Sequence, residues 1–245
     1  MRSAIARELG RDIEYHGTID STQTRARALA SGGAERGIVV ADEQRAGQGT
    51  RERVWHAPPG TSLLASWILR PAPAVPSLFA ALAGVAVARA LDALGCEGAR
   101  LKWPNDVELG GRKVAGALAH GSSDGGGGSL VIGIGINVHQ REAAFPAELR
   151  ATATSLAIWG RSVDRLELLA RVTAELDRLE DHAAIASARD EWRARSSLQD
   201  AGVVVSVPGR AALAGTVTGI DDEGALLVRT ASGVERVVAG DVHRA

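Results

Sequence analysis

The sequence predicts a mixed α+β sheet domain followed by a small antiparallel β domain. Before residue 196, apolar stretches such as "GIVVADEQ" and "SLLASWILR" alternate irregularly with amphipathic segments, which does not fit a regular βαβ array. After residue 196, short strand-like runs separated by Gly, Pro and Asp are typical of a small barrel. We therefore divide the chain into residues 1–195 and 196–245.

Three segments before the division are expected to form helices. The stretch "DSTQTRARALASGG" has capping residues at Asp20 and Ser21 and ends in a glycine pair, so it predicts a short helix. Apolar residues at helical spacing predict a second helix from about Ser77 to Leu94. Asp164 and Glu167 have the spacing of a capping box and predict the start of a third.

Strands are expected between these helices. The β-branched run "GIVVADEQ" predicts a core strand that delivers Gln44 to a rim, and "ARLKWP" predicts a short strand. The stretch "VELGGRKVAGALAH" predicts a hairpin, because Gly110 and Gly111 suit a two-residue turn that needs positive φ. In "LVIGIGINV", Gly133 and Gly135 permit a ligand or another backbone to approach closely.

Composition narrows the class of protein. The chain has 245 residues, 45% of them hydrophobic, which supports a sizeable core without covalent staples. A net charge of −1 gives no electrostatic reason to expect a nucleic-acid binder. The single cysteine, Cys96, fits a reducing compartment. The most apolar stretch is interrupted by Arg89 and Asp92 and predicts a buried helix, so we expect a soluble cytoplasmic protein with no membrane partner.

The loop "GQGTRERVW" has features of an anion-binding segment. Gly47 and Gly49 leave backbone N–H groups accessible, and Arg51 and Arg53 are suited to phosphate oxygens. Trp55 is suited to stacking on a nucleobase. A surface turn with a buried tryptophan is the alternative, and spaced glycines alone are a weak signal.

A second stretch, "KWPNDVELGGRKVAG", adds charged and polar groups. Asn105 and Asp106 follow a short strand, where a hard cation such as Mg²⁺ could be reached, although an ordinary Asn-Asp turn is the alternative. Trp103 is expected to pack in the core. After the glycine turn, Lys113 begins the returning strand, and Gly116 leaves room for a ligand.

The motifs "DST", "DEQRAGQG", "KWPNDV", "RKVAG" and "GIGINV" occur in this order, and the set resembles the biotin protein ligases. The resemblance runs from about Tyr15 to Val138, and the segment after residue 196 also resembles the end domain of that family. It implies a mixed-sheet catalytic domain of the biotin/lipoate ligase type with a C-terminal SH3-like barrel. The sequence begins directly at the catalytic domain, so we expect the monofunctional type without an N-terminal DNA-binding domain.

The resemblance implies an activity, substrates and a partner. In the family, biotin and ATP form biotinyl-5′-AMP and pyrophosphate with Mg²⁺, and a lysine of a carrier domain then attacks the adenylate. The expected partner is the biotin carboxyl carrier domain of a biotin-dependent carboxylase such as acetyl-CoA carboxylase. Nucleic acid is not expected as a partner, and a homodimer is left open.

The resemblance also implies site residues. The implied catalytic residues are Lys113, Arg53 and Asp106, with Asp106 also meeting Mg²⁺ directly or through water. The implied biotin contacts are Ser21, Thr22, Gln44, Gly47, Gln48, Lys113 and Gly116. The implied ATP or adenylate contacts are Gly49, Arg51, Arg53, Trp55, Lys102, Asn105 and Asn137.

The loop departs from the family pattern G-R-G-R-x-G-R-x-W. Gln48 and Thr50 replace arginines, and Glu52 replaces a glycine. The arginine missing at position 50 normally helps to retain the adenylate, so we hypothesise that this chain holds biotinyl-AMP less tightly.

Three other functions compete with this interpretation. A lipoate or octanoyl ligase of related fold is disfavoured by "KWPND" and by the polar trio Ser21, Thr22 and Gln44, which suits a ureido ring. A catalytically weak sensor of biotin or adenylate is suggested by the altered loop but disfavoured by the retention of Lys113 and Asp106. An RNA-binding role of the C-terminal segment is disfavoured because that segment has no aromatic residue for stacking on bases.

Overall fold

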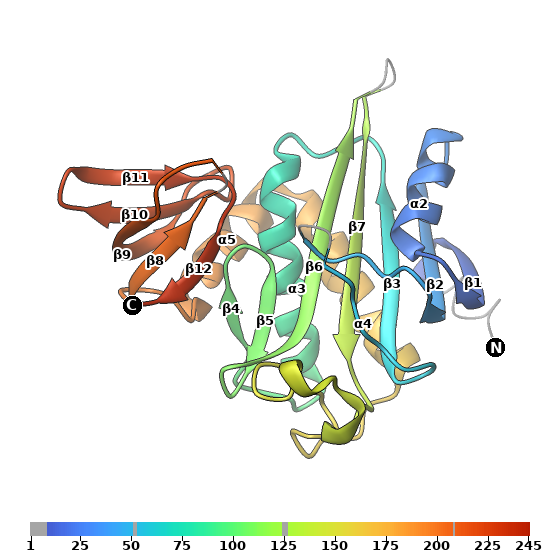
Figure 1. Ribbon diagram of the computed structural model, residues 1–245. Coiled ribbons are helices and arrows are strands. Elements are labelled where there is room, and N and C mark those ends of the chain that lie inside the picture. The colour runs from blue at the N-terminus through green and yellow to red at the C-terminus, as the bar shows by residue number, and fades with distance from the viewer. Residues whose placement is uncertain (1–8, 51–52, 124–126, 208) are drawn as a thin grey trace.

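A computed structural model describes residues 9–50, 53–123, 127–207 and 209–245. The segment "DGGGGS", Asp124 to Ser129, whose composition predicts a flexible turn, lies partly outside them. Its larger unit is a seven-stranded mixed sheet with strand order β1-β2-β3-β7-β6-β5-β4 (Figure 1). Only β1 and β2 run parallel, and the other pairs are antiparallel. The strands are β1 (Asp12–Ile19), β2 (Arg36–Gln44), β3 (Ser62–Leu69), β4 (Arg100–Lys102), β5 (Asp106–Leu109), β6 (Arg112–Ser122) and β7 (Ser129–Asn137).

Helices cover both faces of this sheet, which explains why every residue of β3 is buried. The main core joins the sheet to α3 (Phe79–Ala93) and α4 (Arg165–Asp177). On the opposite face, Val39, Ile68 and Val131 pack with alanines of α2 (Thr22–Ser31). These strand residues face away from the main core because successive residues of a strand point to opposite faces of the sheet. The helix α2 covers only part of this second face and leaves the rest open for a site.

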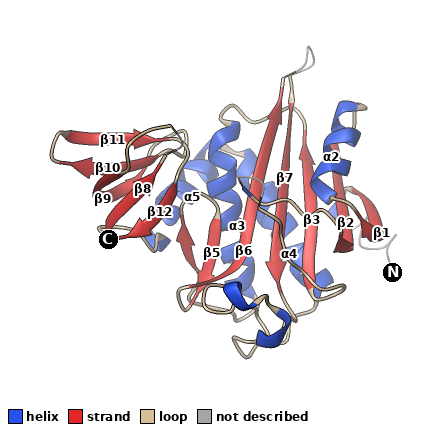
Figure 2. Ribbon diagram, viewed as in Figure 1, coloured by secondary structure: helices blue, strands red, loops and turns tan. Residues whose placement is uncertain are grey.

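The predicted helices are confirmed, and their caps follow the sequence signals. The Ser21 side chain caps α2, and the Asp164 carboxylate accepts from the backbone N–H groups of Leu166 and Glu167. The segment Pro76–Ala93 is apolar and long enough to cross a membrane, but 67% of it is buried in the core. The sequence did not predict β1 or α5 (His182–Arg195). The described residues also form short 3₁₀ helices: η2 (Pro76–Leu78), η3 (Glu142–Ala144), η4 (Ala147–Leu149) and η5 (Arg178–Glu180) (Figure 2).

The C-terminal unit is a five-stranded antiparallel sheet in the order β11-β10-β9-β8-β12. Its strands are β8 (Gly202–Ser206), β9 (Leu213–Ile220), β10 (Leu226–Thr230), β11 (Gly233–Val237) and β12 (Asp241–Arg244). This agrees with the predicted small antiparallel domain, although no pairing among the described strands joins β11 to β12 and closes a barrel. All five strands follow α5, which ends at Arg195, and the division at residue 196 remains our proposal.

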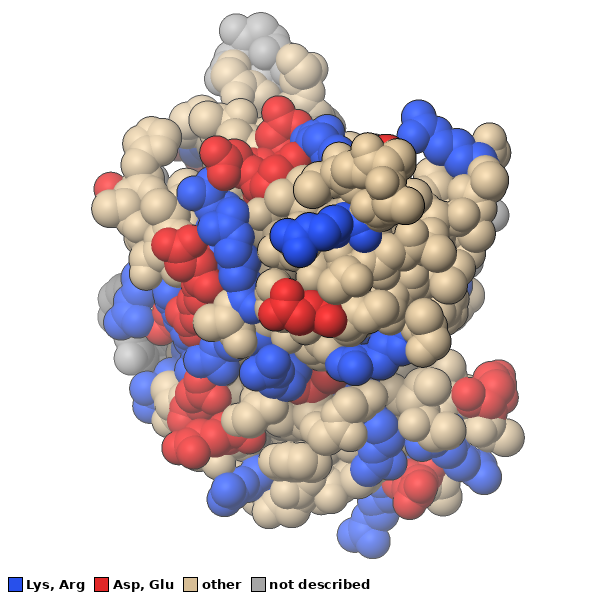
Figure 3. All heavy atoms as spheres, turned by 90° about the vertical axis from the view of Figure 1, so that its left-hand side faces the viewer, with Lys and Arg blue, Asp and Glu red and all other residues tan. Residues whose placement is uncertain are grey.

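The two sheets are joined by hydrogen bonds and by one continuous core. The Trp103 indole nitrogen donates to the Gly224 carbonyl at 2.9 Å, so this tryptophan is a core residue, as expected. Arg193 donates to the Ile220 carbonyl at 2.9 Å. Apolar residues of both units belong to the same buried cluster. On the side of the molecule that carries the C-terminal sheet, basic and acidic side chains are interspersed (Figure 3).

Candidate active site

A cleft lies on the sheet face that α2 leaves open. Its floor is formed where β6 and β7 carry glycines in place of side chains, with Gly116 paired to Gly135 across the two strands. The cleft contains about 490 Å³ of space, open solvent included. Its lining comes from α2, the strands β2, β3, β6 and β7, the "KWPND" turn and the loop before β3. The principal lining residues are Ser21, Thr22, Gln23, Gln44, Gln48, Gly49, Thr50, Trp55, Ser66, Asn105, Lys113, Gly116, Leu118, Gly133 and Gly135.

One end of the cleft is polar and uncharged. Ser21 precedes the first turn of α2, and its Oγ accepts from the Thr24 N–H at 3.3 Å. The backbone N–H of Thr22 donates to Gln44 Oε1 at 2.7 Å, and the Thr22 hydroxyl oxygen lies 3.0 Å from the same atom. Gln44 is the last residue of β2, so the helix start and the strand end bring these three side chains together.

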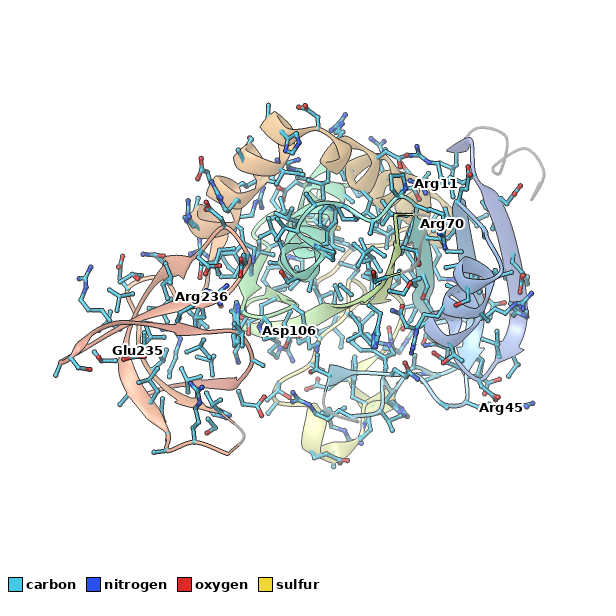
Figure 4. All side chains as sticks on the ribbon, turned by 90° about the horizontal axis from the view of Figure 1, so that it is seen from above. Arg11, Arg45, Arg70, Asp106, Glu235 and Arg236 are labelled. Atoms are coloured by element: carbon cyan, nitrogen blue, oxygen red, sulfur yellow. The ribbon has the colours of Figure 1, made fainter. Side chains whose placement is uncertain are left out.

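The other end carries a lysine that is held in place by its neighbours. Lys113 Nζ lies 2.6 Å from a carboxylate oxygen of Asp106. The backbone of Lys113 is fixed from the opposite side, because its N–H donates to the Thr152 carbonyl at 2.7 Å and its carbonyl accepts from the Thr154 N–H at 2.8 Å. Asp106 lies on the part of the sheet nearest the C-terminal strands (Figure 4).

The indole of Trp55 occupies the middle of the cleft. A methyl group added at Gly135 would lie 2.6 Å from the ring, and one added at Gly116 would lie 3.3 Å from it. The Lys113 ammonium is 5.4 Å from the ring centroid. The indole N–H is buried and has no hydrogen-bond partner among the described residues. The two glycines therefore accommodate a flat aromatic ring, and its donor remains available for an acceptor.

Asp106 and Trp55 hold Lys113 only weakly. The Lys113 and Asp106 side chains are 35% and 26% exposed, and ion pairs with such access to water contribute about 0–1 kcal/mol. A cation–π contact at a comparable site adds about 0.5–1 kcal/mol. An anionic ligand with direct access to the ammonium can therefore replace both contacts.

The described parts of the loop, residues 47–50 and 53–55, pair with each other beside the cleft. The Gly49 N–H donates to the Arg53 carbonyl at 2.7 Å, and Gln48 and Val54 form a β-bridge. The Arg53 guanidinium contacts Thr50 and reaches Asp241 of β12 at 3.2 Å. Arg53 is 64% exposed, so this ion pair joins the loop to the C-terminal sheet at the surface. Arg51 and Glu52 lie outside the described residues.

Each of the two units matches a known protein family in sequence. Residues 16–137 match the Biotin/lipoate A/B protein ligase family, and residues 203–243 match the Biotin protein ligase C terminal domain. The biotin–[acetyl-CoA-carboxylase] ligase of Paracoccus denitrificans is 37% identical over 234 residues, which cover 91% of this chain and 96% of that protein. The chain belongs to the biotin protein ligase family.

Other relatives of this ligase agree with the assignment. The bifunctional ligase/repressor BirA of Bacillus spizizenii is 34% identical over 247 residues, covering 96% of this chain and 74% of that protein. Among solved structures, the biotin protein ligase from Aquifex aeolicus in complex with biotin and ATP matches with a TM-score of 0.80 at 27% identity, covering 96% of this chain and 99% of the other. These comparisons confirm the predicted family, fold class and enzyme class.

The structure of this ligase brings most of the expected site residues together. Among the residues implied by the sequence, those that line the cleft are Ser21, Thr22, Gln44, Gln48, Gly49, Trp55, Asn105, Lys113 and Gly116. Asp106 reaches the cleft through its contact with Lys113. Gly47 is buried beside the Trp55 backbone, where an added methyl group would lie 3.0 Å from the Trp55 carbonyl oxygen. Their roles toward biotin and ATP remain proposals.

Three further expected residues, besides Gly47 and Asp106, do not line the cleft. Arg53 bonds to Thr50 and Asp241. Lys102 lies on the edge strand β4 and lines a separate groove toward the C-terminal sheet. Asn137 is 4% exposed, and its amide is engaged by the Thr154 carbonyl and by Gln140. Its position corresponds to a strand-end cap, the alternative to an adenine contact.

Sequence reasoning missed two side chains at the polar end. Gln23 directly follows the "DST" motif and is 4% exposed. Ser66 is fully buried on β3 and faces the cleft. The signal for Ser66 was present, because a polar residue stands alone in the otherwise apolar run "LLASWIL".

The cleft offers little to a metal ion by itself. No group of three or more His, Cys, Asp or Glu side chains that could hold a metal exists among the described residues. The described lining contains no carboxylate, and Asp106 stands behind Lys113. Mg²⁺ usually binds through one or two carboxylates plus substrate phosphates, so Asp106 fits a Mg²⁺ ion that arrives with ATP.

Proposed function

We propose that this ligase activates biotin with ATP and transfers it to a lysine of a biotin carboxyl carrier domain. The observation that carries the proposal is the arrangement of one cleft: an uncharged hydrogen-bonding end, a floor of glycines and a lysine at the far end. Biotin has the matching order of groups, with a ureido ring, an apolar chain and a carboxylate. Relatives that bind biotin and ATP or that are named for this reaction support it.

In the first step, a carboxylate oxygen of biotin attacks the α-phosphorus of ATP. The bond from that phosphorus to the bridging oxygen breaks, and pyrophosphate leaves with the electron pair. We infer that Lys113 exchanges Asp106 for the two approaching anions and stabilises the charge that develops between them. Mg²⁺, when bound, would neutralise phosphate charge, with Asp106 as the nearest carboxylate.

In the second step, the neutral amine of the carrier lysine attacks the acyl carbon of biotinyl-AMP. An amide bond forms, the acyl–phosphate bond breaks, and AMP leaves. No nucleophile from the ligase is required, so its residues act by positioning the reactants. The carrier domain as acceptor and the cytoplasmic location remain predictions.

The experiment that tests the proposal is biotin-dependent exchange of labelled pyrophosphate into ATP. The sequence has two lysines, Lys102 and Lys113, which makes the comparison clean. We expect Lys113→Ala to lower exchange about 10²–10³-fold, as for loss of one group that stabilises a developing charge. Lys102→Ala should retain exchange, because Lys102 lies in a separate groove.

Lipoate distinguishes this function from that of a lipoate ligase. Exchange that depends on lipoate instead of biotin would contradict the proposal. Tight biotin binding without any exchange would show a binding protein on a ligase fold.

A further inference from the structure

Four side chains form an unbroken hydrogen-bond chain at the polar end of the cleft. Thr22 Oγ1 is 3.0 Å from Gln44 Oε1 and 2.9 Å from Ser66 Oγ. Ser66 Oγ is in turn 3.2 Å from Gln23 Oε1. The chain connects β2, α2 and β3, and Thr22, Gln23 and Ser66 are 3%, 4% and 0% exposed. Three of its four members are therefore shielded from water.

The orientation of the Gln23 amide is set by backbone carbonyls. Its Nε2 donates to the carbonyls of Val131 at 3.1 Å and Leu118 at 3.4 Å. Its Oε1 must consequently face Ser66, where it can only accept a hydrogen. The amide is packed beneath Gly133, where an added methyl group would lie 2.3 Å from Oε1. Gln23 thus presents a fixed acceptor to the Ser66 hydroxyl.

The number of hydroxyl hydrogens decides whether this chain of side chains offers a donor or an acceptor to a ligand. Thr22 and Ser66 have one hydroxyl hydrogen each, whereas the chain contains three oxygen–oxygen contacts. The arrangement that places a hydrogen in both contacts of Ser66 Oγ has Thr22 donating to Ser66 and Ser66 donating to Gln23, while Gln44 still accepts from the Thr22 N–H. Both hydroxyl hydrogens are then used internally, so Ser66 offers the cleft a lone pair.

Ser21 offers the cleft a hydrogen-bond donor instead of an acceptor. Its Oγ accepts from the Thr24 N–H, and its own hydrogen has no acceptor among the described residues. The polar end therefore combines a free donor with buried acceptors. A ligand group that fits both has a carbonyl next to ring N–H groups, as a cyclic urea has.

We propose that Ser66 is a specificity-determining residue that accepts a ring N–H of the substrate, and that Gln23 is a positioning residue that turns the Ser66 hydrogen away from the cleft. This inference rests on the proposed function and adds two residues to it. An apolar head such as a dithiolane would leave Ser66 without a partner for its lone pair. A buried polar group left unpaired costs about 1–3 kcal/mol, which corresponds to roughly 5–150-fold in affinity.

Calorimetric titration with isosteric ligands tests the proposal. The ligands are biotin and the two cyclic carbamates in which one or the other ring N–H is replaced by oxygen. In the wild-type protein, the carbamate that lacks the N–H facing Ser66 should bind at least tenfold more weakly than biotin. In Ser66→Ala that difference should disappear, because the acceptor that distinguished the two ligands is gone.

A matched control separates recognition from packing. Ser129→Ala removes another buried serine hydroxyl, one that contacts Ser122 outside the cleft, and should keep the wild-type preference. Gln23→Met, which removes the fixed acceptor and frees the Ser66 hydrogen, should shrink the preference without abolishing binding. Equal weakening of biotin and both carbamates in Ser66→Ala would reduce Ser66 to a structural role and overturn the inference. Failure of the wild-type protein to bind biotin would instead overturn the proposed function, and the inference with it.

Discussion

Gly116 and Gly135 face each other across β6 and β7 and keep the middle of the cleft free of side chains. The Trp55 ring fills that room. A ligand that spans from the polar end to Lys113 must share or take this space. The absence of a Cβ at two positions therefore matters as much to the site as any functional group.

Gly135→Ala should impair ligand binding. The new methyl group would lie 2.6 Å from the Trp55 ring and would occupy the cleft floor. Overpacking typically costs about 1–3 kcal/mol, so we expect roughly 5–150-fold weaker biotin binding by calorimetry. Gly17→Ala is the matched control, because Gly17 lies in β1 with open space around it. Equal, unchanged affinities of both variants would contradict this description of the floor.

Trp55 should report ligand entry by fluorescence. The centroid of its ring lies 5.4 Å from the Lys113 ammonium, and a bound carboxylate would change that contact. We expect biotin with ATP to change the tryptophan emission of the wild-type protein and to leave that of Trp55→Phe unchanged. The four remaining tryptophans serve as the internal reference. If the emission of Trp55→Phe changed as much as that of the wild-type protein, the signal would come from another tryptophan.

Individual residues differed in how far the sequence could place them. Short-range motifs located Ser21, Thr22 and Lys113, because helix caps and hairpin turns are decided by neighbouring residues. Arg53 and Asn137 could not be placed, because their partners Asp241 and Gln140 depend on tertiary structure. The sequence motif also did not show that Lys102 lies on the edge strand of the sheet, and its contact with ATP stays a prediction.

At the level of elements, strong periodicity and capping signals predicted α2, α3 and α4 correctly. The strand β1 was not predicted, because it is an edge strand whose polar and partly exposed residues, among them Glu14 and His16, give no apolar run. Arg25 of α2 pairs with Glu14 and lowers the pKa of that carboxyl to about 2. The helix α5 escaped because only Ala188 and Trp192 among its described side chains are buried, which leaves little apolar periodicity.

The loop of residues 47–55 is the element in which this ligase departs from its family. Thr50 lines the cleft, and its hydroxyl accepts from Arg53 at 3.3 Å. Thr50→Arg would add a cation beside the expected position of the adenylate phosphate. A hydrogen bond to a charged group contributes about 1.5–3 kcal/mol when sheltered, so we expect release of biotinyl-AMP to slow roughly tenfold in this open loop.

The measurement is the release rate of labelled biotinyl-AMP, with biotinylation of bystander lysines as a second readout. Ser232→Arg adds the same charge in the remote turn between β10 and β11 and should leave release unchanged. If wild-type protein already retains the adenylate as well as Thr50→Arg does, the hypothesis of weak retention is wrong.

The whole molecule combines two sheets that share a single core. Buried residues of β3, α3, β8 and β10 belong to one cluster, and Trp103 joins the sheets through its bond to Gly224. The sequence indicated two units from a change in composition. It did not indicate how closely they pack, because an interface depends on which apolar faces meet.

The shared core predicts cooperative unfolding. We expect one transition in urea, with the same midpoint by tryptophan fluorescence and by circular dichroism. Trp103→Phe keeps the aromatic ring but leaves the Gly224 carbonyl without its donor, so the free energy of unfolding should fall by about 1–3 kcal/mol. Two separated transitions in the wild-type protein would show that the units fold independently.

The most direct test of the central claim is a single-turnover transfer reaction followed by intact-mass spectrometry. The ligase is mixed with biotin, ATP, Mg²⁺ and a biotin carboxyl carrier domain, with a carrier whose acceptor lysine is changed to alanine as the control. The account predicts one biotinyl group on the acceptor lysine of the intact carrier, none on the control, and no product with Lys113→Ala ligase. Formation of biotinyl-AMP with no transfer to any carrier lysine would contradict the assignment of this chain as a protein-modifying ligase.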